Sequence, residues 1–193
     1  MRRLAIYCGS ATPADPAYIA EARAVGRGLA ERGIGVVYGG GRLGLMGAVA
    51  DAALEAGGEV IGAIPRALVD MEVAHRGLTE LHVVETMHQR KQLFTDLCDG
   101  FVTLPGGTGT MDELWEALSW AQLGYHAKPV GLLNSGGFYD GLVSFWTTMS
   151  EVGFVRPQHV ELLIVGNSLD ALLERMTAFV PVQTIVATKA SDL

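Results

Sequence analysis

Short apolar runs alternate with amphipathic segments along the whole 193-residue chain, and this alternation restricts the fold more than any other sequence feature. The apolar runs are typical of buried strands, whereas the segments between them have the 3.6-residue period of helices. Strands that alternate with helices form a parallel sheet that the helices cover. The sequence therefore predicts an α/β protein with a doubly wound, mostly parallel sheet and helices on both faces.

The chain is expected to form one domain over residues 1–193, because no low-complexity linker or internal repeat interrupts the alternation. Residues 179–193 carry no clear pattern and are expected to form a C-terminal tail that frays or packs on a partner. The expected strands are Leu4–Cys8, Gly35–Tyr38, Val60–Ile64, Leu81–Val84, Phe101–Leu104, Val130–Leu133 and Leu162–Val165. The expected helices begin at Asp15-Pro16, Met46, Thr86, Thr110, Tyr139 and Ser168.

Charge and hydropathy limit the partners of the chain. The formal net charge of -7 argues against nucleic acid or an anionic membrane, but it leaves room for a small phosphorylated ligand at a local positive site. No apolar stretch approaches the ~18 residues of a membrane span. The apolar run that begins the chain ends at Gly9, so it is too short for a signal peptide. We expect a cytoplasmic protein.

Cysteines and histidines give no sign of a disulfide or a metal site. Cys8 lies in an apolar strand pattern and Cys98 on an apolar helix face, so both are expected to be buried thiols in a reducing compartment. The five histidines form no His-x-x-x-His pair, and zinc is therefore not expected.

Three expected turns between a strand and a helix carry nine of the 25 glycines. Successive glycine N–H groups and the positive end of a following helix can bind an anion such as phosphate. Tight turns also need glycine for structural reasons alone, so one such turn would be weak evidence. Two long glycine-rich turns after strands in one domain favour a phosphate or nucleotide site. The three turns are Tyr7–Ser10, Tyr38–Gly47 and Leu104–Thr110.

The second turn contains Gly39, Gly41 and Gly44, which have the spacing of a dinucleotide fingerprint. In a dehydrogenase that fingerprint follows the first strand, and an acidic residue ends the next strand. Here it follows the second expected strand, and the next strand ends at Ile64 and Pro65. A nicotinamide-dependent redox enzyme is therefore the weakest functional hypothesis. The absence of a lysine in the turns also excludes an ATP-hydrolysing P-loop.

Arg90 lies on the apolar stripe of the helix that begins at Thr86. Around the helix axis it is roughly 40° from Phe94 and roughly 20° from Leu97, so the guanidinium is predicted to face the core. An unpaired buried charge is costly, and the cation therefore needs an anionic partner. That partner is a carboxylate of the chain, a ligand phosphate or a reacting carboxylate, and these alternatives do not exclude one another.

Glu113 has two interpretations. With Thr110 it fits a capping box, in which both side chains satisfy N–H groups at a helix start. Alternatively, Asp112 and Glu113 lie beside a bound phosphosugar, because their helix begins at a glycine-rich turn. A carboxylate there can stabilise an oxocarbenium-like centre, activate water or attack the sugar, as cleavage of an N-glycosidic bond requires.

Taken together, these residues resemble the Lonely Guy (LOG) family of cytokinin-activating phosphoribohydrolases. The family signature Pro-Gly-Gly-x-Gly-Thr-x-x-Glu is matched by Pro105–Glu113, and the resemblance covers about residues 4–165. Its other matches are Tyr7–Ser10, Gly39–Gly41, Gly44–Gly47, Met87, Arg90-Lys91, Trp120–Gly124 and Lys128–Gly131.

The resemblance implies a Rossmann-like fold, a homodimer with the active site near the subunit interface, and hydrolysis of an N6-modified adenosine 5′-monophosphate to the free base and ribose 5-phosphate. It implies that Arg90 and Glu113 are catalytic. Relatives often have glutamate where this chain has Asp112, so Asp112 stays a second candidate for the reacting carboxylate. The expected substrate-binding residues are Ser10, Gly40, Gly41, Gly44, Met46, Glu72, Lys91, Gly106, Gly107, Thr108, Gly109, Thr110 and Asp112.

The reaction that the resemblance implies needs no metal and no organic cofactor, and the expected partner is a small-molecule nucleoside 5′-monophosphate. Family members have often been labelled lysine decarboxylases, but pyridoxal-phosphate enzymes need a Schiff-base lysine beside a cofactor pocket. Nothing in the sequence places Lys91, Lys128 or Lys189 in that way. The alternative from another functional class is a nucleotide- or molybdenum-cofactor-binding carrier on the same fold.

Overall fold

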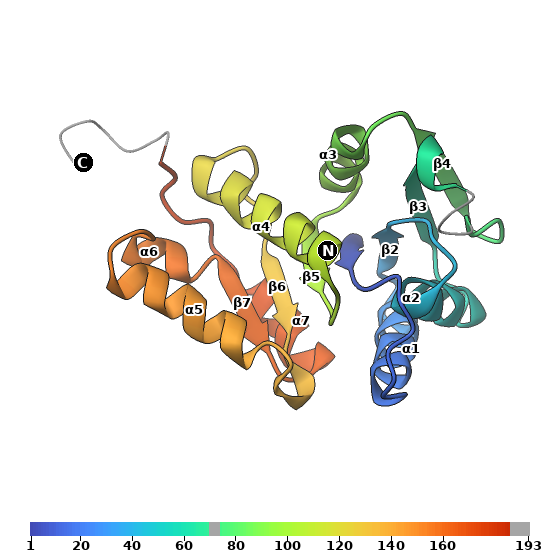
Figure 1. Ribbon diagram of the computed structural model, residues 1–193, viewed down its shortest axis with the longest axis horizontal. Helices are drawn as coiled ribbons and strands as arrows, with labels where there is room; N and C mark the ends of the chain where they lie inside the picture. Colours follow the sequence, from blue (N-terminus) through green and yellow to red (C-terminus); the bar gives the residue numbers. More distant parts are fainter. Residues whose placement is uncertain (70–73, 186–193) are drawn as a thin grey trace.

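The structure, a computed structural model, describes residues 1–69 and 74–185 and is built around one seven-stranded sheet (Figure 1). The strand order is β4-β3-β2-β1-β5-β6-β7, and every neighbouring pair is parallel. This arrangement confirms the predicted doubly wound fold. The strands are β1 (Arg3–Tyr7), β2 (Gly35–Tyr38), β3 (Val60–Pro65), β4 (Glu80–Val84), β5 (Gly100–Thr103), β6 (Val130–Leu133) and β7 (Leu163–Gly166).

The seven strands lie where they were predicted, and β2 and β6 have the predicted bounds. The other five differ by one residue at one or both ends, because backbone pairing rather than side-chain polarity defines a strand. In β5, for example, Gly100 pairs with Leu4 of β1 although glycine has no apolar side chain to reveal the strand.

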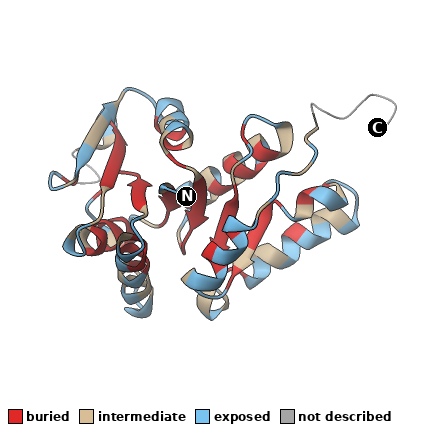
Figure 2. Cartoon of the chain, turned by 180° about the vertical axis from the view of Figure 1, so that it is seen from behind, coloured by how far each residue is buried: buried red, intermediate tan, exposed pale blue. Residues whose placement is uncertain are grey.

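Helices cover both faces of the sheet, and two hydrophobic clusters fill the space between the layers (Figure 2). Successive strand residues point to opposite faces, so Leu4 and Ile6 join the first cluster whereas Ala5 and Tyr7 join the second. The first cluster is completed by α1 (Ala17–Glu31), α2 (Gly44–Glu55) and α7 (Leu169–Thr177). The second cluster is completed by α3 (Met87–Leu97), α4 (Thr108–Leu123) and α5 (Asp140–Glu151).

Short elements connect the main ones, and sequence periodicity did not predict them. They are the 3₁₀ turns η1 (Arg66–Leu68) and η2 (Ser135–Gly137) and the four-residue helix α6 (Pro157–Val160). Segments this short contain too few turns to show a helical period. In the described part of the chain, no helix is both long and apolar enough to cross a membrane.

The segment after α7 returns across the molecule and lies against α4 and α6 (Figure 1). The N–H of Ile185 donates to the carbonyl of Gln122 at 2.9 Å, and the carbonyl of Gln183 lies 3.0 Å from Nε2 of the buried His159. Residues 179–185 of the expected tail therefore pack on their own chain, whereas residues 186–193 lie outside the described residues.

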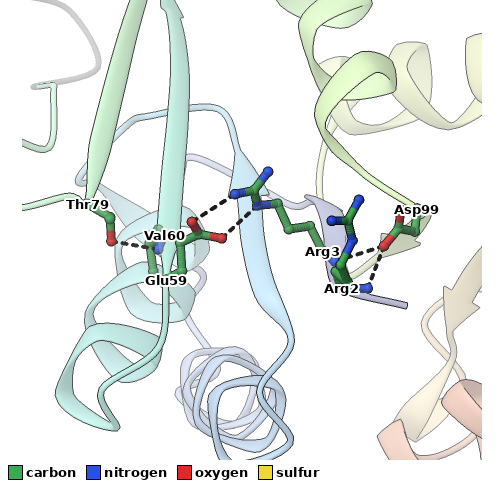
Figure 3. A network of polar contacts seen from close by, with 6 residues as sticks. All are labelled: Arg2, Arg3, Glu59, Val60, Thr79 and Asp99. Carbon is green, nitrogen blue, oxygen red and sulfur yellow. Dashed lines mark hydrogen bonds and ion pairs between the residues drawn. The ribbon is translucent and has the colours of Figure 1, made fainter.

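Charged side chains link the segments at the amino ends of the strands, the edge opposite to the glycine-rich turns (Figure 3). Arg3 donates to both carboxylate oxygens of Glu59 at 2.6 and 2.9 Å, and Asp99 accepts from the N–H of Arg3 at 3.2 Å. The Arg3 hydrogen bond lowers the pKa of Glu59. The Arg3–Glu59 ion pair and the Asp99 hydrogen bond therefore tie β1 to the segments that precede β3 and β5.

Candidate active site

The turns after β1 and β5 meet at the point where the strand order reverses. The two strands are neighbours, with Tyr7 opposite Thr103, so their carboxyl ends lie side by side. The N–H of Gly9 donates to the carbonyl of Pro105 at 3.1 Å. A Cβ on Gly106 would lie 2.9 Å from the nitrogen of Gly9, so glycine is needed for this approach. Open α/β sheets bind ligands at such a switch point.

At the glycine-rich turn before α2, a carbonyl of the protein itself occupies N–H groups of the helix start. The N–H groups of Leu45 and Met46, in the first turn of α2, both donate to the carbonyl of Gly9, at 3.0 and 3.3 Å. Gly44 has a φ of +60°, and a Cβ there would lie 2.3 Å from the carbonyl oxygen of Ala11. Gly44 therefore allows the two loops to pack closely. The N–H groups of Leu45 and Met46 are already used within the chain and are not available to an anion.

Gly40 and Gly41 also make contacts within the chain. The carbonyl of Gly40 accepts from the N–H of His75 at 2.9 Å, and Gly41 forms an antiparallel bridge with Ala74. The turn before α2 therefore has fewer backbone groups left for a ligand, and the expected substrate contacts of Gly40, Gly41 and Gly44 stay predictions.

The start of α4 is open. The helix begins at Thr108 with Gly107 as its N-cap and no side-chain cap, two residues before the predicted start. The predicted capping box between Thr110 and Glu113 is wrong, because Thr110 is already the third helical residue and packs against Gly106. Among the hydrogen bonds of the described residues, none uses the N–H of Thr108, Gly109 or Thr110. Three helix-start donors are thus available to a ligand.

This open helix start faces a cavity of about 350 Å³. The cavity brings together eight of the predicted site residues, which come from the turns after β1 and β5 and from α2, α3 and α4. Its described lining consists of Cys8, Gly9, Ser10, Ala11, Met46, Leu68, Met87, Arg90, Gly107, Thr108, Gly109, Thr110 and Glu113.

Arg90 extends from α3 into this cavity and is only 4% exposed, as its position on the apolar stripe predicted. Its Nη2 donates to the carbonyl of Gly39 at 3.1 Å, and its guanidinium carbon lies 5.6 Å from the centre of the Phe94 ring. A Cβ on Gly39 would lie 2.0 Å from Nη2. Gly39 therefore makes room for the guanidinium, a role that its place in a glycine-rich turn did not reveal.

Arg90 and Glu113 are the charged side chains in the described lining, and both act electrostatically on the end of β1. Burial, and then the negative charge of Glu113, raise the pKa of Tyr7 and of the Cys8 thiol, whereas Arg90 opposes the shift. The Tyr7 hydroxyl and the Cys8 thiol both stay protonated at neutral pH, so the thiol is unsuited to act as a nucleophile. The charged groups in the described lining are thus a guanidinium and a carboxyl group.

Other predicted residues lie outside the described lining. Lys91 forms ion pairs with Asp112 at 3.1 Å and with Glu116 at 2.8 Å. Glu72 lies outside the described residues, so its expected contact with substrate stays a prediction. Five residues of the lining were not among the predicted site residues, namely Cys8, Gly9, Ala11, Leu68 and Met87. Leu68 belongs to the short η1 turn, which has no sequence signal.

The two cysteines and His126 are buried and form no metal site with other described residues. Cys8 and Cys98 are buried free thiols, as predicted. Nε2 of His126 donates to the carbonyl of Ala117 at 2.9 Å, and burial lowers the pKa of this imidazole to about 4. Residues 1–69 and 74–185 contain no group of three or more His, Cys, Asp or Glu side chains that could hold a metal ion.

A family model described as "Possible lysine decarboxylase" matches residues 46–176. The site does not fit the pyridoxal phosphate that this description implies, because the described lining contains no lysine. Lys91 is held by two carboxylates, and Lys128 donates to the carbonyls of Thr95 and Cys98. Lys189 lies outside the described residues.

Solved structures with the same fold include the molybdenum cofactor carrier protein of Chlamydomonas reinhardtii. The likeness has a TM-score of 0.69 and 22% identity, and it covers 92% of this chain and 98% of that one. It shows the fold alone.

Relatives at higher identity carry one common description. The probable cytokinin riboside 5′-monophosphate phosphoribohydrolase LOGL9 of Oryza sativa subsp. japonica is 43% identical over 94% of this chain and 80% of its own length. The cytokinin riboside 5′-monophosphate phosphoribohydrolase LOG3 of Arabidopsis thaliana is 41% identical over 97% of this chain and 87% of its own length. On these matches, the chain belongs to the LOG family, as the resemblance had implied.

Proposed function

We propose that the protein hydrolyses the N-glycosidic bond of an N6-modified adenosine 5′-monophosphate and releases the free cytokinin-type base and ribose 5-phosphate. The names of its relatives as cytokinin riboside 5′-monophosphate phosphoribohydrolases support this substrate and reaction. The observation that carries the proposal is the convergence of an open helix start, Arg90 and Glu113 on one cavity. A nucleotide needs an anion site next to groups that can act on its sugar, and this cavity combines the two.

The substrate phosphate is placed at the first turn of α4. Its oxygens accept from the N–H groups of Thr108, Gly109 and Thr110, and the positive end of the helix dipole adds to the attraction. The exposed hydroxyls of Ser10 and Thr108 line the same cavity and can donate as well. The ribose then extends toward Arg90 of α3 and Glu113 of α4, which both line the cavity.

The reaction breaks the bond between C1′ of the ribose and N9 of the base. The bonding electrons leave with the base, which takes up a proton, and C1′ gains the oxygen of water. Positive charge develops on the sugar in the transition state, and the Glu113 carboxylate stabilises it. Glu113 then either removes the proton from the attacking water or attacks C1′ itself. Arg90 orients the carboxylate and stabilises the anionic charge of the substrate.

The test is product release from AMP and from isopentenyladenosine monophosphate, measured by chromatography of the free base and of ribose 5-phosphate. We expect the wild-type protein to release both products and the Arg90→Ala and Glu113→Ala variants to lose turnover. The exposed Glu151 on α5 supplies a matched control, Glu151→Gln, which should keep full activity. Tight binding of intact nucleotide without turnover by the wild type would contradict the proposal and favour a carrier.

We further propose that the protein is a cytoplasmic homodimer. Leu43 and Met87 are 47% and 40% exposed, and Met87 lines the active cavity, so a second copy at this position would cover apolar surface and complete the site. Size-exclusion chromatography with light scattering should give twice the 20.5 kDa chain mass. A species of single-chain mass would contradict the dimer.

A further inference from the structure

Helix α3 buries two neighbouring cations, and the proposed reaction uses only one of them. Arg90 and Lys91 are 4% and 7% exposed, and they point to different partners. Arg90 enters the cavity, whereas Nζ of Lys91 lies 3.1 Å from Oδ2 of Asp112 and 2.8 Å from Oε2 of Glu116. Both of these carboxylates are on α4, the helix that also carries Glu113.

Lys91 stays charged in this position. Burial acts to lower its pKa, but the hydrogen bonds to Glu116 and Asp112 outweigh burial and raise it. The side chain of Glu116 is 22% exposed and that of Asp112 is 60% exposed, so the 2.8 Å contact with Glu116 is the better shielded of the two ion pairs. A charged, buried contact with two partners gives a fixed distance between the helices.

The ion pairs of Lys91 and the proposed catalytic groups join the same two helices. Arg90 and Lys91 are adjacent on α3, and Glu113 directly follows Asp112 and precedes Glu116 by three residues. Around α4, Glu113 is about 60° from Glu116 and about 100° from Asp112. A displacement of α3 relative to α4 would therefore move Arg90 relative to Glu113.

We propose that Lys91 is a positioning residue, which holds α3 against α4 through Asp112 and Glu116 and thereby sets the placement of Arg90 relative to Glu113. Its charge also balances two carboxylates beside Glu113, near the place proposed for the substrate phosphate. The alternative, direct contact between Lys91 and substrate, fits the observed contacts less well. Two of the three Nζ protons already face carboxylates, and Lys91 is not part of the described lining. This inference rests on the proposed function.

The test compares Lys91→Met and Glu116→Gln with the wild type. The readouts are kcat and KM for isopentenyladenosine monophosphate, the inhibition constant of ribose 5-phosphate and the thermal melting temperature. A misplacement on the order of 1 Å costs about 100-fold in rate, so we expect Lys91→Met to lower kcat by about 10- to 100-fold. KM and the inhibition constant should stay within about threefold, because the phosphate donors on α4 are intact. Glu116→Gln should change kcat in the same direction by a smaller factor.

Two further variants separate positioning from a loss of folding. Lys91→Arg keeps a cation that can bridge two carboxylates, and it should recover most of the lost kcat. Lys128 is a matched control, because it is also a lysine near α3 but donates to the carbonyls of Thr95 and Cys98. Lys128→Met should lower the melting temperature and leave kcat unchanged. If Lys91→Met does not fold, Glu116→Gln and Lys91→Arg still test the proposal through kcat.

Three results would overturn the proposal. A tenfold or larger rise in the ribose 5-phosphate inhibition constant with kcat retained would assign Lys91 to substrate binding. An active wild type with unchanged kcat in Lys91→Met and Glu116→Gln would show that the ion pairs position nothing. A wild type that releases no base would refute the proposed function first, and the role of Lys91 with it.

Discussion

Helices α2 and α4 both begin at a glycine-rich turn after a parallel strand, yet only one of them has an open start. In α2 the second and third helical N–H groups donate to the carbonyl of Gly9. In α4 the corresponding groups, of Gly109 and Thr110, meet no acceptor among the described residues. A glycine-rich sequence is therefore insufficient evidence for an anion site. A helix start can bind an anion only where its first-turn N–H groups have no acceptor within the protein.

The glycines of the two turns differ in the same way. A Cβ on Gly47 of α2 would lie 1.9 Å from the carbonyl oxygen of Arg42, whereas a Cβ on Gly107 or Gly109 would meet no atom within 4 Å. The α2 glycines serve the packing of the fold, and the α4 glycines leave space in front of the helix. Substitutions at the helix starts test this difference.

Glu113→Gln should have the largest effect, because it removes the carboxylate that α4 places in the cavity and keeps the side chain's size. General acid–base groups contribute about 10²- to 10⁴-fold, so we expect kcat to fall by about 10³-fold. Asp112→Asn is the matched variant, since Asp112 is the second candidate for the reacting carboxylate. If Asp112→Asn loses more activity than Glu113→Gln, the assignment of Glu113 is wrong.

Gly47→Ala should mainly affect folding. The added methyl overlaps the backbone at Arg42, so we expect the free energy of unfolding to fall by about 3 kcal/mol, measured by urea denaturation. A variant as stable as the wild type would show that the α2 turn tolerates side chains, and the proposed division between the two turns would then fail.

Gly109→Ala should mainly affect ligand binding. Its methyl points into open space at the cavity, so the free energy of unfolding should stay within about 0.5 kcal/mol of the wild type. Weakened hydrogen bonds to a charged phosphate cost about 1.5–3 kcal/mol, so the inhibition constant of ribose 5-phosphate should rise about tenfold or more. Gly141→Ala on α5, also in open space, is the control that should bind normally.

Thr86→Ala should have the smallest effect. Helix α3 begins with a capping box, in which Thr86 accepts from the N–H of Gln89 and Gln89 accepts from that of Thr86. Loss of such a cap costs about 1 kcal/mol of unfolding free energy. Ser168→Ala, which removes the cap at the start of α7, should lower the free energy of unfolding by a similar amount. Binding of ribose 5-phosphate should not change. A tenfold loss of binding in Thr86→Ala would mean that the start of α3, like that of α4, serves the ligand.

The features that local pattern determines could be predicted from the sequence. Alternating apolar runs revealed the seven strands, and the position of Arg90 on an apolar stripe correctly placed its side chain inside the protein. The helix start at Thr86 was likewise predicted, because a threonine there can cap a helix, and the structure has Thr86 as the N-cap of α3.

The features that depend on distant segments could not be predicted. The acceptor for the first-turn N–H groups of α2 is the carbonyl of Gly9, which lies in the turn after β1. The ion pairs of Lys91 on α3 likewise depend on two residues of α4. The start of α4 was misplaced because Thr110 and Glu113 have the spacing of a capping box. The backbone at Gly107 begins the helix earlier, and Glu113 then lies in the second turn.

A crystal structure of the Glu113→Gln variant with AMP tests the central claim most directly. We expect the phosphate oxygens at hydrogen-bond distance, about 3 Å, from the N–H groups of Gly109 and Thr110, with C1′ of the ribose facing residue 113. A phosphate bound at the turn before α2, or a ribose that lies away from Arg90 and residue 113, would contradict the account.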